Sequence, residues 1–349
     1  MSDRAQAGLR GPVKSCIEEN TLPPIPDVPE RSSEIRYQFT STYDPEGHEL
    51  STVHGNSDGS QWINRNQYNT SGQLLKTVYG TEGKAQTETI YSYDLEGKLQ
   101  KITSSGREQT PVVFHYDEHG RKTQVVTSLA SDYRGDRAAA GSPFEVAQMP
   151  PNLPGGGTAT TIFDDNDRPK EAQIRDASGA IATRAFRTYD LQGRITEEKQ
   201  VQENLVAMFP PDVLAKLKNE SGLSTEQLQQ GLTAQLSQLM GGQNSIYSVA
   251  YQYDSDGRVV HTSRRIFNHQ EEIEITYNER GDPDSEITRS ARPTEEGPTA
   301  PDESSCNETR YSYQYDEHGN WTERTVEYRR GSDGAFQSSS TTKRSLTYY

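Results

Sequence analysis

Apolar and polar residues alternate along many short stretches of this chain, with the period expected of β-strands. Val249, Tyr251 and Tyr253 share one face of such a stretch, while Ser, Gln, Thr and Glu dominate the opposite faces. The same alternation occurs at Ile273, Ile275 and Tyr277 and at Tyr311, Tyr313 and Tyr315. Because one face is apolar and the other polar, the pattern predicts antiparallel strands with one face packed and one in water.

The strand-like stretches end in a recurring phrase: an aromatic residue, then Asp or Asn, then Gly three residues later. An Asp or Asn side chain can bond its own backbone two residues on, and Gly takes the left-handed conformation without steric cost. The phrase therefore predicts a tight hairpin turn. Its residues are Tyr43, Asp44, Gly47, Tyr68, Gly72, Tyr93, Asp94, Gly97, Tyr116, Asp117, Gly120, Phe163, Asp164, Tyr189, Asp190, Gly193, Tyr253, Asp254, Gly257, Tyr277, Gly281, Tyr315, Asp316 and Gly319.

The short intervals between these anchor aromatics cluster near 24 residues, enough for two strands and two turns. Such units predict an all-β chain, a curled or spiralling antiparallel sheet of about 9–10 hairpins, because wide twisted sheets do not stay flat. We expect the tyrosines on the concave side, with rings of neighbouring strands stacked in ladders.

The chain divides into residues 1–34, an N-terminal capping strand with a proline-rich link, and 35–349, the hairpin ribbon. Within the ribbon, 130–160 and 291–308 are rich in Gly and Pro and predict loops. Residues 203–245 predict two helices, with Pro211 in a first turn and Ser224 with Gln227 as a capping box. The apolar stripe of the second helix either covers an edge or mouth of the sheet or forms a plug or docking helix; it comprises Leu228, Leu232, Leu236 and Leu239.

The turn phrase resembles that of the YD-repeat, or RHS-repeat, family. Residues 251–259 match in full, from Tyr251 and Tyr253 to Arg258 and Val259, and residues 91–99 match with Lys98 for Arg. The copy at 189–195 has Arg187 where the family has its first aromatic residue. The resemblance implies a non-enzymatic structural or interaction protein, a secreted or cell-surface bacterial scaffold that binds a protein or glycan. The alternative is a cargo-holding shell or immunity component associated with a polymorphic toxin system.

Composition adjusts this picture in two ways. Apolar residues make up 30% of the 349 residues and the mean hydropathy is −0.93, but 19 tyrosines can build a core that hydropathy scores poorly. A net charge of −15 argues against nucleic-acid binding, which needs clustered Lys and Arg. Because no apolar run reaches the ~20 residues of a membrane helix, we expect no membrane insertion. We expect a secreted or cell-envelope location.

Candidate chemistry is sparse. Cys16 and Cys306 can form a disulfide if the two ends of the chain meet in space; otherwise they are unrelated thiols. The seven histidines fall in turns or isolated positions, and no nucleophile or phosphate-binding motif is present. We therefore expect no catalytic residue, cofactor or metal site.

Overall fold

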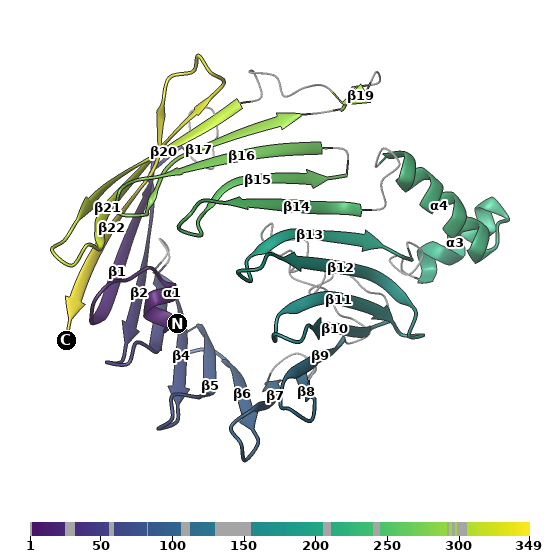
Figure 1. The fold of residues 1–349 in the computed structure, drawn as a ribbon, viewed down its shortest axis with the longest axis horizontal. Coiled ribbons are helices and arrows are strands. Elements are labelled where there is room, and N and C mark those ends of the chain that lie inside the picture. The colour runs from purple at the N-terminus through teal and green to yellow at the C-terminus, as the bar shows by residue number, and fades with distance from the viewer. Residues whose placement is uncertain are drawn as a thin grey trace.

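The computed structural model describes residues 2–24, 32–55, 59–81, 83–105, 112–129, 155–204, 211–239, 245–267, 269–291, 293–294, 297–298 and 306–349. Twenty strands form one antiparallel sheet, and two further two-residue strands pair only with each other. The sheet is a ring: each strand pairs with its neighbours along the chain, and the first strand also pairs with the last. Figure 1 shows this closed arrangement.

The sheet strands of the first half are β1 (Val13–Leu22), β2 (Ile35–Tyr43), β3 (Glu49–Gly55), β4 (Gln61–Tyr68), β5 (Leu74–Thr81), β6 (Thr87–Tyr93), β7 (Leu99–Ser104), β8 (Val112–Tyr116), β9 (Lys122–Leu129) and β10 (Gly157–Phe163). Those of the second half are β11 (Pro169–Asp176), β12 (Ile181–Tyr189), β13 (Ile195–Gln202), β14 (Ser245–Tyr253), β15 (Val259–Ile266), β16 (His269–Tyr277), β17 (Pro283–Ala291), β20 (Cys306–Tyr315), β21 (Trp321–Arg330) and β22 (Gln337–Tyr348). The short pair is β18 (Pro293–Thr294) and β19 (Gly297–Pro298).

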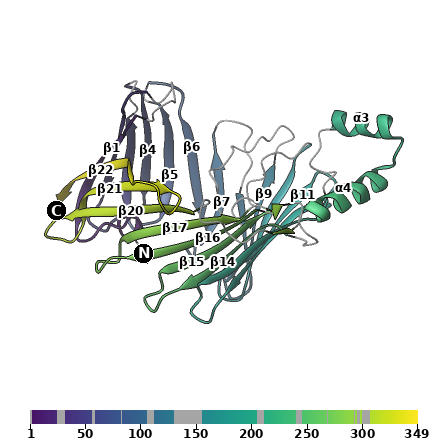
Figure 2. The ribbon, with the colours of Figure 1, turned by 90° about the horizontal axis from the view of Figure 1, so that it is seen from above.

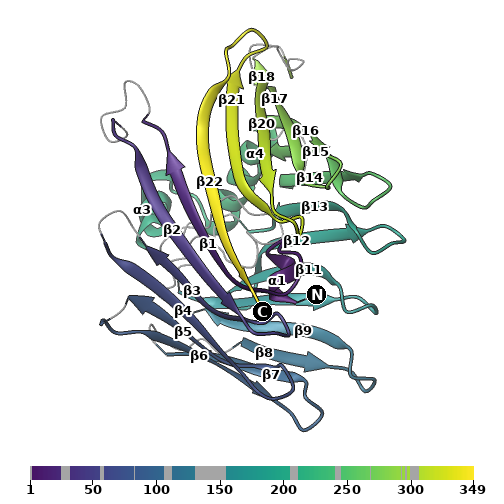
Figure 3. The same cartoon turned by 90° about the vertical axis from the view of Figure 1, so that its left-hand side faces the viewer.

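Closure depends on β1. Its residues pair with β2 on one side, where Glu18 faces Phe39, and with β22 on the other, where Glu18 faces Arg344. Figure 3 shows β1 lying between these two strands. An open or spiralling ribbon was therefore the wrong prediction: the all-β class with a helical insertion is confirmed, but the sheet is a closed 20-stranded barrel. The physical reason is that β1 satisfies the backbone of both strands that would otherwise be free edges.

The first and last segments meet at this seam. β1 does not cap an open ribbon, because it is a barrel strand itself. A short helix, α1 (Asp3–Gln6), precedes it, and the amide of Tyr349 donates to the carbonyl of Pro12 at 3.1 Å. Leu9, Val13, Cys16 and Tyr43 form a small buried cluster there. The division into domains 1–34 and 35–349 stays a prediction.

The predicted helical insertion is confirmed. It contains α3 (Pro211–Ser221) and α4 (Thr225–Leu239), and the expected capping box forms: the Gln227 amide donates to Ser224 Oγ at 3.2 Å, and the Ser224 amide donates to Gln227 Oε1 at 2.9 Å. Figures 1 and 2 show both helices projecting away from the ring. The interpretation of a plug inside the hollow is therefore wrong.

The strands that flank the predicted loops end at the same end of the barrel as β13 and β14, which flank this insertion. Within 130–160, residues 157–160 belong to β10, and 130–154 lie outside the described residues. Within 291–308, the two-residue strands β18 and β19 pair with each other, and β20 begins at Cys306.

Candidate functional site: the barrel wall and its turn rim

The two ends of the barrel differ in their connections. At one end, nine connections of five residues each follow the strands that finish with an anchor aromatic. At the other end the connections vary in length, from the two residues 267–268 to the 42 residues 203–244. The structure thus gathers all the predicted turn residues at one end, which we call the turn rim, and all the long insertions at the other, which we call the loop rim.

The turn at Asp254 shows how each rim turn is held. The Asp254 carboxylate accepts N–H bonds from Asp256 and Arg258 at 2.9 Å each, and its second oxygen accepts one from Arg258 Nε at 2.7 Å. Gly257 has φ +81°, which a side chain would strain. Asn278 makes the same backbone bonds in its turn, and Asp167 takes the position of Gly with φ +58°.

Neighbouring turns are tied together through the anchor tyrosines. The Arg258 guanidinium lies 4.8 Å from the Tyr277 ring centroid, and the Tyr277 hydroxyl donates to the Val259 carbonyl at 2.7 Å. Equivalent hydroxyl bonds join Tyr93 to Leu74, Tyr116 to Leu99, Tyr189 to Pro169 and Tyr253 to Ile195. These contacts link successive turns along much of the rim.

The predicted ladder of stacked tyrosine rings is not what holds the described residues together. Tyr313 and Tyr315, whose rings are 5.8 Å apart, lie on a single strand and so do not form a ladder across strands. Successive anchor tyrosines sit on alternate strands, about 10 Å apart, which exceeds the 4.5–7 Å of an aromatic pair. Arg and Lys side chains fill the space between them instead.

The turn carboxylates titrate below their ordinary range. The pKa of Asp254 is lowered, chiefly by the backbone amide of Arg258 and then by its guanidinium. The pKa of Asp117 is lowered in the same way by the amide and side chain of Arg121. These groups hold structure at the rim, because each is already engaged by its own turn.

The face that carries the anchor aromatics, the anchor face, also carries most of the buried side chains, including Ile174, Val249 and Thr342. Side chains converge on the concave side of a curved sheet and lose exposure there, so we assign the anchor face to the barrel interior. A ring of 20 strands is too wide for side chains to fill, since barrels of 16–18 strands already leave an aqueous channel.

Among the described residues, three cross-strand ion pairs lie on this interior face. Arg187 donates to Glu198 at 2.6 Å, and Glu198, only 1% exposed, also accepts the Tyr251 hydroxyl at 3.1 Å. The other two pairs are Arg264 with Glu271 and Arg344 with Glu18, each at 2.7 Å. The sequence analysis did not identify these ion pairs. The available signal was a charged residue at a strand position that shares its face with the anchor tyrosines.

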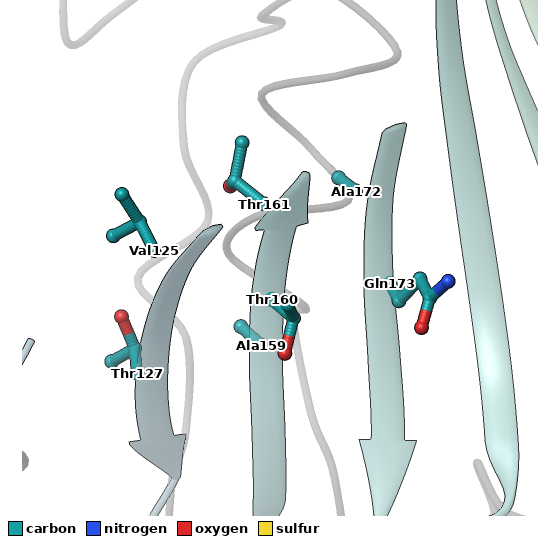
Figure 4. A pocket seen from close by; sticks show the side chains of 7 residues that line it. All are labelled: Val125, Thr127, Ala159, Thr160, Thr161, Ala172 and Gln173. Carbon is teal, nitrogen blue, oxygen red and sulfur yellow. The ribbon is translucent and has the colours of Figure 1, made fainter. Parts of the chain in front are cut away.

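Hollows open on the wall among the described residues, and the largest of three, about 370 Å³, lies where β1, β2 and β3 meet. The other two differ in their lining. Figure 4 shows one of about 170 Å³ beside β9, β10 and β11, lined by Val125, Thr127, Ala159, Thr160, Thr161, Ala172 and Gln173. None of these seven described residues is charged. The other, about 240 Å³, contains the stacked rings of Trp62 and Tyr79, which are 41% and 51% exposed.

The cysteines do not pair. Cys16 and Cys306 are both free thiols, on β1 and β20. Two strands, β21 and β22, separate them in the ring, which places them about 14 Å apart across the sheet. A disulfide requires Cα atoms 4.4–6.8 Å apart.

Within the described ranges, no group of three or more His, Cys, Asp or Glu side chains could hold a metal ion. No helix among these residues is long and apolar enough to cross a membrane.

No family model matches the chain, and no curated protein matches it. Among solved structures, it aligns with a porin-like protein from Bacteroides uniformis at 10% identity, covering 97% of this chain and 99% of the other, with a TM-score of 0.38. It also aligns with a porin-like protein from Bacteroides vulgatus at 11% identity, covering 97% and 98%, with a TM-score of 0.18. The barrel assignment itself rests on the strand pairing.

The predicted membership in the YD-repeat or RHS-repeat family is wrong: no family model matches the chain, and its sheet closes into a ring instead of forming an open or spiralling ribbon. The roles inferred from it fall with it: the scaffold for a protein or glycan, and the toxin-associated shell or immunity component. The expected partners are corrected with it. The expectation of no membrane insertion rested on the lack of an apolar helix, and this ground does not hold for a closed ring of strands, which leaves no free edge. The turn phrase misled because any hairpin of this geometry calls for Asp and Gly.

Proposed function

We propose that the chain is a porin-like barrel of the bacterial cell envelope whose lumen passes small polar solutes. The observation that carries the proposal is the closed ring of 20 antiparallel strands, in which each strand pairs with its neighbours in the chain. Closure leaves no free edge, which is the condition for a sheet to span a bilayer.

The asymmetry of the two rims supports this function. Outer-membrane barrels have an even number of strands, short turns on one side and longer loops on the other. Here nine five-residue turns form one rim, and the connections that reach 42 residues (203–244) form the other. Strands such as β14, β16, β20 and β21 have 9 or 10 residues, within or close to the ~9–11 residues of a tilted transmembrane strand.

The interior supports passage of polar solutes. Its ion pairs, such as Arg187 with Glu198, place paired charges on the wall. These charged groups, set among the anchor aromatics, offer polar contacts to water and polar solutes.

The outer face of the barrel carries charged side chains. Glu197 and Lys199 alternate with interior residues on β13, and Glu272 and Glu274 do so on β16. A lipid-facing Lys at the bilayer midplane costs about 2–4 kcal/mol. Insertion therefore requires these charges to lie near a rim or to pair.

The test is reconstitution of the purified chain into lipid vesicles, followed by solute-driven swelling with sugars and amino acids of increasing size. A porin-like barrel gives swelling that falls as solute size rises, and it stays with the vesicles after a carbonate wash. Heat-unfolded chain added in the same way is the matched control. A chain that remains in the aqueous fraction as a folded monomer, with no swelling, overturns the proposal.

A further inference from the structure

Two arginines converge on one indole on the interior wall. Trp321 and Arg324 lie on β21, and Arg344 lies on the adjacent β22. The guanidinium carbon of Arg344 is 3.4 Å from the centroid of the Trp321 ring, and that of Arg324 is 5.0 Å from it. Two positive charges therefore share one small region of the wall.

The charge there is not balanced. Arg344 donates to Glu18 at 2.7 Å, but the cross-strand neighbours of Arg324 are Tyr313 and Thr342, which are neutral. Both neutral groups are already engaged: the Tyr313 hydroxyl donates to the Pro283 carbonyl, and the Thr342 hydroxyl donates to Asn20. Among the described residues, a carboxylate thus pairs with Arg344, while Arg324 forms no ion pair.

In the part of the chain that the structure describes, the two guanidinium groups also have N–H donors without an acceptor. The Arg324 Nε and Arg344 Nη1 atoms are buried and have no hydrogen-bond partner among the described residues. The Arg344 side chain is only 10% exposed. A buried donor on a charged group that lacks an acceptor is costly, so both atoms favour an incoming acceptor.

We propose that Arg324 and Arg344, held by the Trp321 ring, bind an oxyanion group of a solute on the lumen wall, with phosphate as the favoured form. Planar guanidinium groups match phosphate and carboxylate oxygens through paired N–H bonds. The anion supplies the acceptor that both buried donors lack and offsets the uncompensated positive charge. This inference rests on the proposed channel, for which it identifies oxyanions as a class of solute. Phosphate binding can nevertheless be measured on a chain that does not conduct.

The experiment follows Trp321 fluorescence in a Trp62→Phe background, because these are the two tryptophans of the chain. Inorganic phosphate titrated into the purified chain gives a saturable change in Trp321 emission. Arg324→Gln weakens phosphate binding at least about tenfold, since charged hydrogen bonds contribute most to such sites. Acetate, titrated separately, distinguishes a carboxylate preference from a phosphate preference.

Two further variants keep the test decisive. Arg324→Lys keeps the charge without the planar fork and binds phosphate with intermediate affinity. Glu18→Gln removes the carboxylate that competes for Arg344 and tightens phosphate binding several-fold. Arg289→Gln is the matched control, because Arg289 pairs with Glu274 on the opposite face of the sheet and its loss changes the net charge equally; its phosphate affinity equals that of the parent.

The inference is overturned if phosphate leaves Trp321 emission unchanged, or if Arg324→Gln binds phosphate as tightly as the parent. A chain that binds phosphate but produces no vesicle swelling contradicts only the channel proposal. A chain that conducts solutes with no phosphate response at Trp321 contradicts only this site.

Discussion

At the scale of single residues, the tyrosine hydroxyls of the turn rim are the links between neighbouring hairpins. Tyr253→Phe keeps the ring but removes the bond to the Ile195 carbonyl, which is 2.7 Å long. We expect the free energy of unfolding to fall by about 1 kcal/mol, the usual net value of such a bond. Equilibrium urea unfolding measures it. Tyr328→Phe, at a ring 40% exposed, is the control and changes stability little; equal losses in both variants would refute the link.

The turn aspartates make stability depend on pH. Because the folded-state pKa of Asp254 is lowered, its contribution is present above the unfolded pKa of about 3.9 and is lost as pH falls through the folded value. Asp254→Asn keeps the backbone acceptor, as Asn278 does naturally, but cannot titrate. We expect the variant to lose less stability than the parent between neutral and strongly acidic pH. Unfolding midpoints across that range measure this, and parallel curves would exclude it.

At the scale of elements, the helical insertion contributes little to the barrel. The described side chains of α3 and α4 are mostly exposed. Gln229 Nε2 donates to the Glu203 carbonyl, just beyond β13, at 3.3 Å. Replacing 206–243 with a short Gly-Ser linker should therefore change the unfolding free energy by less than about 1 kcal/mol. Thermal unfolding checks this, with the full chain as reference. A collapse of stability would mean that the helices pack on the barrel in solution.

The elements were readable from the sequence to different degrees. The hairpins were predictable because their cause is local: Asp254 and Gly257 lie within one turn, and Tyr251 and Tyr253 alternate within one strand. The ion pairs were not, because Arg187 and Glu198 meet only once the register of β12 and β13 is fixed. The contacts between anchor tyrosines and Arg side chains, such as Tyr277 with Arg258, were not predictable either. The 24-residue period does not show that successive anchor tyrosines lie on alternate strands, too far apart for their rings to stack.

At the scale of the whole molecule, closure of the sheet could not be predicted from the pattern of residues along the chain. β1 lacks the turn phrase, and its pairing with β22 joins Val13 to Tyr348 across nearly the entire chain. Nothing local distinguishes a strand that caps an edge from one that joins two. The difference decides function, because an open ribbon offers a surface and a closed ring offers a lumen.

The ring should therefore fail as a unit when β1 is removed. Deleting residues 1–24 frees the edges of β2 and β22, each of which loses a full row of partners, and long unpaired edges recruit other chains. We expect the truncated chain to leave the monomer peak in size-exclusion chromatography with light scattering. A peptide of residues 11–24, supplied during refolding, should restore monomer, since it offers β1 to both edges. Deleting only residues 2–8, which removes α1 and spares β1, is the matched control and should stay monomeric. A stable monomer without β1 and without the peptide would mean that the sheet does not need closure to fold.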